Sequence, residues 1–248
     1  SANGNYTYTL NNSSASIQSL VQDVKVMSNI AVQTVDGTTK LIPLQIRGVN
    51  DVATFTVVAG SSLTLTEDTT LTASGQVTIS DADTGQSSWI TPSSNLLYGT
   101  FNLNLTTGAY TYTLNNNAAI VQVLGDGVVK TDSFTINSMD GTAKVITFNV
   151  QGTNDAPVIT SSTITVVTPE GTNILIPFTA TDIEPGTTLT YSLSGLDASL
   201  FNLDSNHNIR FNNIPSYIFA LDAGRNNIYD INLNVSDGVT TTIKPISI

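Results

Sequence analysis

The sequence predicts an all-β protein made of tandem β-sandwich domains, and three observations lead to this prediction. Thr, Val, Ile, Leu and Tyr, which suit a pleated and half-buried surface, are prominent in a chain that is 40% hydrophobic. Short runs of alternating apolar and polar residues are separated by turn signals such as Asp-Gly. The third observation is an internal repeat, and 248 residues allow two domains and part of a third.

The repeat divides the chain into three units. The segment from Gly4 to Asn12 recurs from Gly108 to Asn116, and the offset of 104 residues continues without a gap to Asn50-Asp51 and Asn154-Asp155. We therefore expect residues 1–50 to be the C-terminal half of a repeat and residues 51–155 to be one complete repeat. Residues 156–248 lack the Tyr-Thr-Tyr segment but keep the acidic turns, which predicts a divergent third unit.

Seven short strands in the complete repeat fit an immunoglobulin-like or cadherin-like Greek-key sandwich. The expected strands span residues 55–58, 63–66, 76–80, 101–105, 109–114, 133–138 and 144–150. In Tyr110-Thr-Tyr112-Thr-Leu114 the two aromatic residues and the leucine share one face, which should face the core. Residues 117–125 are apolar at irregular spacing and are expected to form a helical turn.

Charge and composition exclude several classes of function. Nineteen acidic and eight basic residues give a net charge of −11, which repels nucleic acid and anionic membranes and attracts divalent cations. The chain has no cysteine and one histidine, His207, so disulfides and thiolate metal sites are excluded and a Ser/His/Asp triad is very hard to build. We find no signal peptide, no apolar run near the roughly 20 residues that span a bilayer, and no motif of an enzyme. We expect an internal, non-catalytic segment of a longer chain, without membrane insertion.

The acidic residues predict calcium sites where one domain ends and the next begins. Calcium takes about six to eight oxygen ligands, more than any single loop here supplies. The first predicted site consists of Asn50, Asp51, Asp81, Asp83 and Asp140. The second consists of Glu67, Asn154, Asp155, Asp182, Glu184 and Asp237. Glu170 and Asp222 are expected at the far end of the last unit, facing a domain outside this chain.

Each of these elements also has a plainer interpretation. Asp-Gly at 36, 140 and 237 is a common hairpin turn signal, and Asp81-Ala82-Asp83 suits a solvated loop. The recurrence of an acidic doublet, a linker Asn-Asp and a distal Asp-Gly in the same order favours metal binding. Trp89 and Tyr98 could stack on a sugar, but a lone tryptophan in a sandwich is more often core. His207 is expected in an exposed turn.

Two resemblances follow from these motifs. Gly-x-Tyr-Thr-Tyr-Thr-Leu-Asn-Asn, an Asp-Gly hairpin and the segment Gly152 to Val158 resemble the VCBS repeats of long RTX-type bacterial adhesins, over residues 1–158. Residues 156–248 resemble a bacterial cadherin-like repeat. Pro169-Glu170-Gly171 is similar to its Pro-Glu-Asn element, Asp182-Ile183-Glu184 to Asp-x-Asp, and Leu221-Asp222 to the start of Leu-Asp-Arg-Glu. Glu184 is longer than the usual aspartate by one methylene, and Ala223-Gly224 replaces Arg-Glu.

The resemblance implies calcium ions between domains and a tandem array on a bacterial surface or in a secreted protein. Its partners would be the neighbouring repeats, with other regions meeting a host or biofilm surface. Three functions stay open from the sequence. The first is an extender that projects an adhesive region and is stiffened by calcium. The second is an adhesive module that binds glycan or protein. The third is a fibre subunit that self-associates by strand complementation of the incomplete first repeat.

Overall fold

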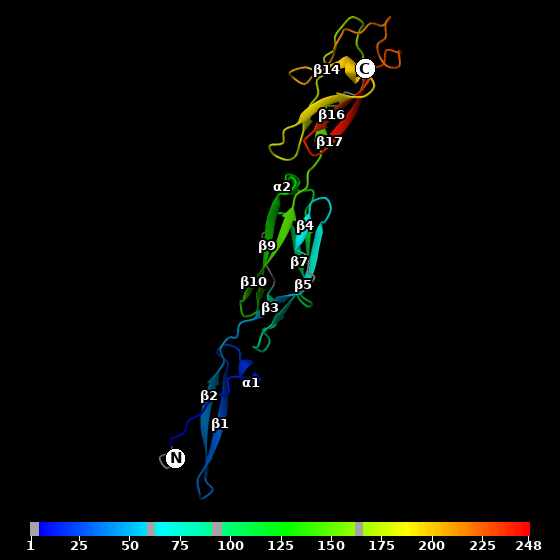
Figure 1. Cartoon of the computed structure of the whole chain (residues 1–248). Helices are drawn as coiled ribbons and strands as arrows, with labels where there is room; N and C mark the ends of the chain where they lie inside the picture. Colours follow the sequence, from blue (N-terminus) through cyan, green and yellow to red (C-terminus); the bar gives the residue numbers. More distant parts are fainter. Residues whose placement is uncertain (1–4, 59–62, 91–95, 162–165) are drawn as a thin grey trace. The chain divides into compact units, whose positions relative to one another are not determined.

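The computed structural model describes residues 5–58, 63–90, 96–161 and 166–248, and these residues form the all-β fold that the sequence predicts (Figure 1). No helix among them is long and apolar enough to cross a membrane. The chain divides into two compact units. Unit 1 comprises Ser1–Leu65, Thr69–Asn115 and Lys130–Val150, and unit 2 comprises Thr66–Asp68, Asn116–Val129 and Gln151–Ile248.

The helices and strands follow one another in this order: α1 (Ala15–Gln18), β1 (Lys25–Gln33), β2 (Thr39–Arg47), β3 (Thr54–Val57), β4 (Thr64–Thr66), β5 (Thr72–Ser80), β6 (Trp89–Ile90), β7 (Gly99–Leu103), β8 (Ala109–Leu114), α2 (Ala119–Gln122), β9 (Val129–Ser138), β10 (Ala143–Gln151), β11 (Val158–Ile159), β12 (Ala180–Thr181), β13 (Thr190–Ser194), the 3₁₀ turn η1 (Ala198–Leu200), β14 (Phe201–Leu203), β15 (Ile209–Phe211), β16 (Asp230–Ser236) and β17 (Thr241–Ser247).

The strands between Thr54 and Gln151, the part of the chain predicted to be a complete repeat, form a two-layer sandwich. One sheet has the strand order β3-β5-β8-β7 and the other has the order β4-β10-β9-β6. Neighbouring strands such as β3 and β5 are not consecutive in the chain, because the chain passes to the other sheet between them. The rings of Tyr112 from the first sheet and Phe148 from the second stack with centroids 4.4 Å apart. Phe101 and Phe134 stack across the layers in the same way, at 3.8 Å. Tyr110, Tyr112 and Leu114 are buried, as their alternation along β8 predicts.

The strands differ from the predicted ones mainly where each begins. β5 starts at Thr72, four residues earlier than expected, because Gly75 continues the strand opposite Tyr110 and does not end it. β9 starts at Val129 because a carboxylate, Asp132, is accommodated inside the strand by hydrogen bonds. The short strand β6, which pairs with the end of β9, was not predicted. The predicted helical turn is present as α2.

Residues 5–47, which the sequence predicts to be part of a repeat, contain α1 and the hairpin of β1 and β2. The two strands pair in continuous antiparallel register from Lys25 opposite Arg47 to Gln33 opposite Thr39. No third strand of the described residues joins this sheet. None of residues 5–47 is buried, so this part of the chain has no core.

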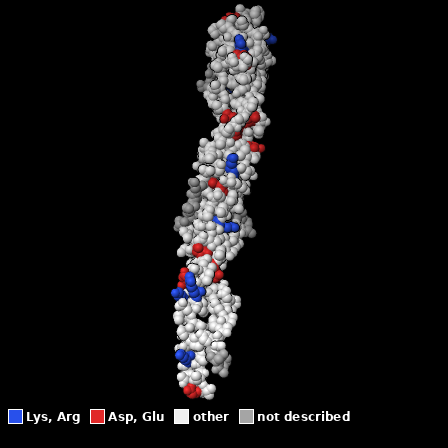
Figure 2. All heavy atoms as spheres, turned by 90° about the vertical axis from the view of Figure 1, so that its left-hand side faces the viewer, with Lys and Arg blue, Asp and Glu red and all other residues white. Residues whose placement is uncertain are grey.

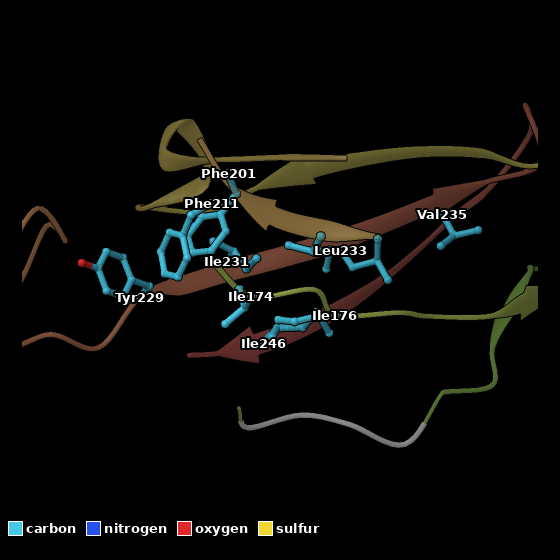
Figure 3. Packing of buried hydrophobic residues seen from close by; sticks show 10 residues of the cluster. Ile174, Ile176, Phe201, Phe211, Tyr229, Ile231, Leu233, Val235 and Ile246 are labelled. Carbon is cyan, nitrogen blue, oxygen red and sulfur yellow. The ribbon is translucent and has the colours of Figure 1, made fainter. Parts of the chain in front are cut away.

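The last domain has its own core. The sheet β13-β16-β17 and the pair β14-β15 carry most of it. Figure 3 shows the buried side chains converging between these strands, with Ile231, Leu233 and Val235 alternating along β16. The rings of Phe201 and Phe211 stack at 4.3 Å, and Tyr229 meets Phe211 edge-on at 5.0 Å. This packed domain supports the acidic loops described next.

Candidate metal centres

Two hairpin turns each present an ionised aspartate. At Asp140, which follows β9, one carboxylate oxygen accepts hydrogen bonds from the Ser138 hydroxyl and from the Thr142 backbone N–H at 3.0 Å. Burial opposes the ionised form of Asp140, but these hydrogen bonds outweigh it and lower the pKa. At Asp237, after β16, the Asn154 amide and the Thr240 N–H lower the pKa of the carboxyl. The Asp-Gly turns are thus hairpins, as the plainer interpretation has it, and they also hold a negative charge in place.

The first predicted site is assembled in unit 1. The linker Asn50 donates its side-chain amide to Asp140 Oδ2 at 3.4 Å. The next backbone N–H, of Asp51, donates to Asp83 Oδ2 at 2.8 Å, and the Asp83 N–H donates to Asp81 Oδ1 at 2.9 Å. The structure therefore brings all five residues of this site together.

The second predicted site, in unit 2, repeats the same three hydrogen bonds. Asn154 donates to Asp237 Oδ2 at 2.8 Å, the Asp155 N–H donates to Glu184 Oε1 at 2.6 Å, and the Glu184 N–H donates to Asp182 Oδ1 at 3.0 Å. The longer side chain of Glu184 thus takes the place of Asp83. The loops are positioned in the same way because β5 and β12 each end immediately before an acidic doublet.

Glu67 joins the second site from the end of β4. Its side chain is fully buried, with Oε1 accepting from the Gln122 amide at 2.8 Å and Oε2 from the Thr153 N–H at 3.3 Å. The six residues predicted for this site therefore lie in one cluster. By the offset of 104, the position equivalent to Glu67 in the first site lies outside residues 1–248.

Both sites contain buried carboxylate oxygens that lack a hydrogen-bond partner. These atoms are Asp81 Oδ2 and Asp83 Oδ1 in the first site, and Asp155 Oδ2, Asp182 Oδ2 and Glu184 Oε2 in the second. Asp83 is 2% exposed. A buried carboxylate oxygen without a donor costs free energy, so each site is electrostatically incomplete as a set of protein groups alone.

The pKa values of the second site reflect this. Burial raises the pKa of Glu67 to about 7, with a smaller contribution from the negative charge of Asp155. Burial likewise raises the pKa of Glu184 to about 7, helped by its neighbour Asp182. The pKa of Asp155 is raised by burial and by the charges of Asp68 and Asp182. The carboxylate oxygens of this site repel one another when they are ionised, and calcium is a hard cation that binds oxygen ligands of this kind.

Sequence reasoning missed two neighbours of these sites. Gln86, three residues after Asp83, has a buried side-chain oxygen, Oε1, without a hydrogen-bond partner. Its position in the acidic loop is the feature of the sequence that could have indicated it. Asp68, next to Glu67, pairs with Asn116 at 2.6 Å and acts on Asp155 by charge. Across the described part of the chain, no three His, Asp or Glu side chains are already arranged around one point to hold a metal ion. Figure 2 shows acidic side chains in small groups on a mainly uncharged face.

Glu170 and Asp222, predicted for the far end of the last unit, are held by backbone donors. The exposed Glu170 accepts from the Tyr217 N–H at 2.9 Å. Asp222 is buried, and its two oxygens accept from the N–H groups of Asn226 and Asn227 at 2.9 and 3.0 Å. Neither residue has a buried oxygen without a hydrogen-bond partner, in contrast to the two sites above, and their role as ligands stays a prediction.

The two aromatic side chains considered for sugar stacking are largely buried in the protein. Tyr98 is buried, and Trp89 is half-buried with its ring 5.8 Å from Phe55. His207 is exposed in a turn, as expected, with φ of 61°.

Comparison with known proteins gives a distant likeness in fold. No family model and no curated protein matches the sequence. The chain is similar to mouse clustered PcdhgC3 EC1-3, with 15% identity and a TM-score of 0.41 over 94% of this chain and 78% of that one. It is similar to mouse cadherin-23 EC22-24, with 15% identity and a TM-score of 0.43 over 90% and 72%. For protocadherin gamma B2 extracellular cadherin domains 1-5 the values are 17% and 0.47 over 90% and 44%.

These matches are to tandem cadherin domains, and they are too distant to carry a functional argument. None of the comparisons supports the VCBS or RTX resemblance, which stays a prediction from the sequence.

Proposed function

We propose that this chain is a non-catalytic extender segment of a secreted or bacterial surface protein, in which calcium binds at the two acidic sites and stiffens the linkers. The observation that carries the proposal is the repeated set of three hydrogen bonds, each time leaving buried carboxylate oxygens without a donor. Two divergent units share this arrangement, although their core sequences differ. If these acidic residues served only to form turns, the buried carboxylate oxygens would not need to lack a hydrogen-bond donor.

The residues of the second site would hold calcium through the oxygens of Glu67, Asp155, Asp182, Glu184 and Asp237 together with Asn154. The ion would supply the positive charge that the buried carboxylates lack. These side chains come from a strand end, a linker and two loops of the following domain, so a shared ion restrains the linker relative to the loops. A ligand that binds the ordered linker better than the disordered one shifts the population towards order, and this gives stiffness.

Isothermal calorimetry with calcium tests this proposal. We expect calcium binding by the wild-type chain and a loss of at least tenfold in affinity at one site, about 1.4 kcal/mol, for Asp155→Ala. The matched control is Asp36→Ala, because Asp36 occupies the same Asp-Gly-Thr turn in the incomplete repeat and accepts its hydrogen bonds only from that turn. Equal heats for the wild type and Asp155→Ala would contradict the proposal.

One observation favours the second candidate, an adhesive module. A hollow of about 420 Å³ in the last domain is lined by Tyr217, Tyr229 and Glu170, among others, and the adjoining Ile218 and Phe219 are more than 70% exposed. A glycan array tests this candidate with the double variant Ile218→Ser, Phe219→Ser. Binding that this variant loses and Asp155→Ala retains would support it, and a wild-type chain that binds no glycan would count against it.

A further inference from the structure

The loop that follows β5 holds three buried side-chain oxygens that have no hydrogen-bond partner. Two are the carboxylate oxygens Asp81 Oδ2 and Asp83 Oδ1 of the first site, and the third is the amide oxygen Gln86 Oε1. A buried polar atom without a partner costs free energy, and a bound ion or water is a common reason for its presence. All three atoms belong to residues 81–86, so one bound cation is the simplest partner for them.

Hydrogen bonds fix the shape of this loop. The Asp83 N–H donates to Asp81 Oδ1 at 2.9 Å, and the Gln86 N–H donates to the Asp83 carbonyl at 3.2 Å. The Ser87 hydroxyl closes the loop, because it accepts from the Asp81 N–H at 2.8 Å and donates to the Asp81 carbonyl at 3.2 Å. Gly85 supplies the left-handed φ of 80° that the turn requires. The loop therefore holds its shape without using the three unpaired oxygens.

The corresponding loop of the second site has a paired side chain at this position. Aligning Asp81 with Asp182 places Thr187 where Gln86 stands in the first site. The Thr187 hydroxyl donates to the Glu184 carbonyl at 3.0 Å, whereas Gln86 Oε1 has no donor. The unpaired oxygen at this position is therefore a property of the first site and not of the turn as such.

We propose that Gln86 Oε1 is a ligand of the cation at the first site, beside Asp81 and Asp83. This inference rests on the proposed function, because it adds a ligand to a site that was proposed there. Calcium binds amide oxygens together with carboxylates. An amide supplies an oxygen without a negative charge, so it adds a ligand and does not increase the repulsion between the two carboxylates.

The opposite orientation of the amide would give Gln86 a different role. The oxygen and nitrogen of a glutamine amide occupy nearly the same space, so a rotated amide would place its NH₂ group where Oε1 lies. That group would donate to a carboxylate in place of the cation. Removing it would then leave cation binding unchanged or make it tighter, whereas removing a ligand oxygen weakens binding.

The test uses terbium, a trivalent cation that prefers oxygen ligands, with its luminescence excited through Trp89. Trp89 is the one tryptophan of the chain, and it pairs with Ser138, whose hydroxyl bonds to Asp140 of the first site. We expect Gln86→Met, which keeps the size of the side chain but removes the oxygen, to weaken terbium binding by at least about tenfold. Luminescence lifetimes in H₂O and D₂O should show about one additional bound water, because water replaces the lost ligand.

Two further variants serve as controls. Gln86→Glu keeps an oxygen at this position and should retain terbium binding, which separates the loss of a ligand from a loss of folding. Thr187→Met makes the matched change in the second site and should leave the Trp89-excited signal as in the wild type.

Terbium binding and a bound-water count that Gln86→Met leaves unchanged would overturn the proposal, and so would tighter binding. If Asp83→Asn abolishes binding in that case, the first site stands and only the role of Gln86 is wrong. A wild-type chain without Trp89-excited terbium luminescence would overturn both this proposal and the proposed function at the first site.

Discussion

At the scale of single residues, Asp132 and Asp83 show two different uses of a buried carboxylate. Asp132 is surrounded by donors: the Tyr112 hydroxyl at 2.8 Å and the N–H groups of Leu97 and Tyr98 at 3.0–3.1 Å. Asp83 is as well buried but keeps one oxygen without a donor. Asp132 therefore has a structural role, whereas the unpaired oxygen of Asp83 is suited to binding a cation.

Asp132→Asn should destabilise the complete repeat by about 1–3 kcal/mol, because an amide NH₂ would replace one of the acceptors that face the three donors. The measurement is urea unfolding with and without calcium, and the loss should be the same in both. Tyr112→Phe, which removes only the hydroxyl, is the milder companion variant. A calcium-dependent loss for Asp132→Asn would show that this carboxylate belongs to a metal site instead.

The raised pKa of Glu67 predicts how the stability of the calcium-free chain depends on pH. Burial raises the pKa from 4.5 to about 7 in the folded state, so the folded chain binds this proton more tightly than the unfolded chain does. Stability should therefore decrease as the pH rises from about 4.5 to 7, since unfolding releases the proton in this range. Thermal unfolding in EDTA at several pH values measures this slope.

Glu67→Gln should reduce that slope, because the amide does not titrate. Asp36→Asn is the control, since the Thr34 hydroxyl lowers the pKa of Asp36 and it titrates below the range in question. An unchanged slope in Glu67→Gln, or a slope of opposite sign in the wild type, would contradict this account of the buried cluster.

At the scale of elements, the turn that follows β10 is fixed by a close backbone approach. A Cβ atom added at Gly152 would lie 1.9 Å from the carbonyl oxygen of Leu124, which follows α2. The same approach occurs at Gly48, where a Cβ would meet the Leu20 carbonyl at 2.3 Å. This contact positions the linker that presents Asn154 and Asp155.

Gly152→Ala should cost about 1–3 kcal/mol of stability, the usual range for overpacking, and should weaken calcium binding at the second site. Gly125→Ala is the matched control in the same unit, because a Cβ there would meet only Glu184 Cγ at an ordinary 3.5 Å. Chemical unfolding and calorimetry of both variants give the comparison. Similar stability losses in the two variants would show that the close approach is not what fixes the turn.

The sequence predicts the strands in which apolar and polar residues alternate regularly. It does not predict the strand ends at which a polar residue or a glycine is accommodated by contacts with distant residues. β8 and β10 were placed well because their apolar residues alternate without interruption. The start of β9 was missed because Asp132 looks like a loop residue until its donors are known. Likewise Gly75 resembles a strand end, and its place opposite Tyr110 is a long-range fact. Local pattern cannot supply either of these contacts.

The recurrence of the motifs in one order indicated which acidic residues lie near one another, and their role as metal ligands stays a prediction. The sequence assigned Glu67 to the same site as Asn154 and Asp155, and in the structure Glu67 accepts from the N–H of Thr153, the residue before Asn154, and is acted on by the charge of Asp155. It did not find Gln86, because a neutral side chain carries no charge signal. It also could not show which oxygens lack donors, since that depends on the packing around each carboxylate.

At the scale of the whole molecule, packed domains are connected by acidic linkers whose charge protein groups alone do not neutralise. The complete repeat and the last domain each have a hydrophobic core, so they should remain folded without calcium. Calcium should therefore act mainly on the linkers and on the elements that contact them. The chain would then change from a jointed to a stiff form as calcium binds.

The most direct test is a thermal melt combined with small-angle X-ray scattering on one sample, first in millimolar calcium and then in excess EDTA. We expect calcium to raise the melting temperature and to lengthen the scattering particle, and Asp155→Ala to lose much of both effects. Asp36→Ala should behave as the wild type. A melting temperature and a particle length that are the same in calcium and in EDTA would contradict the central claim, and the acidic clusters would then be turns only.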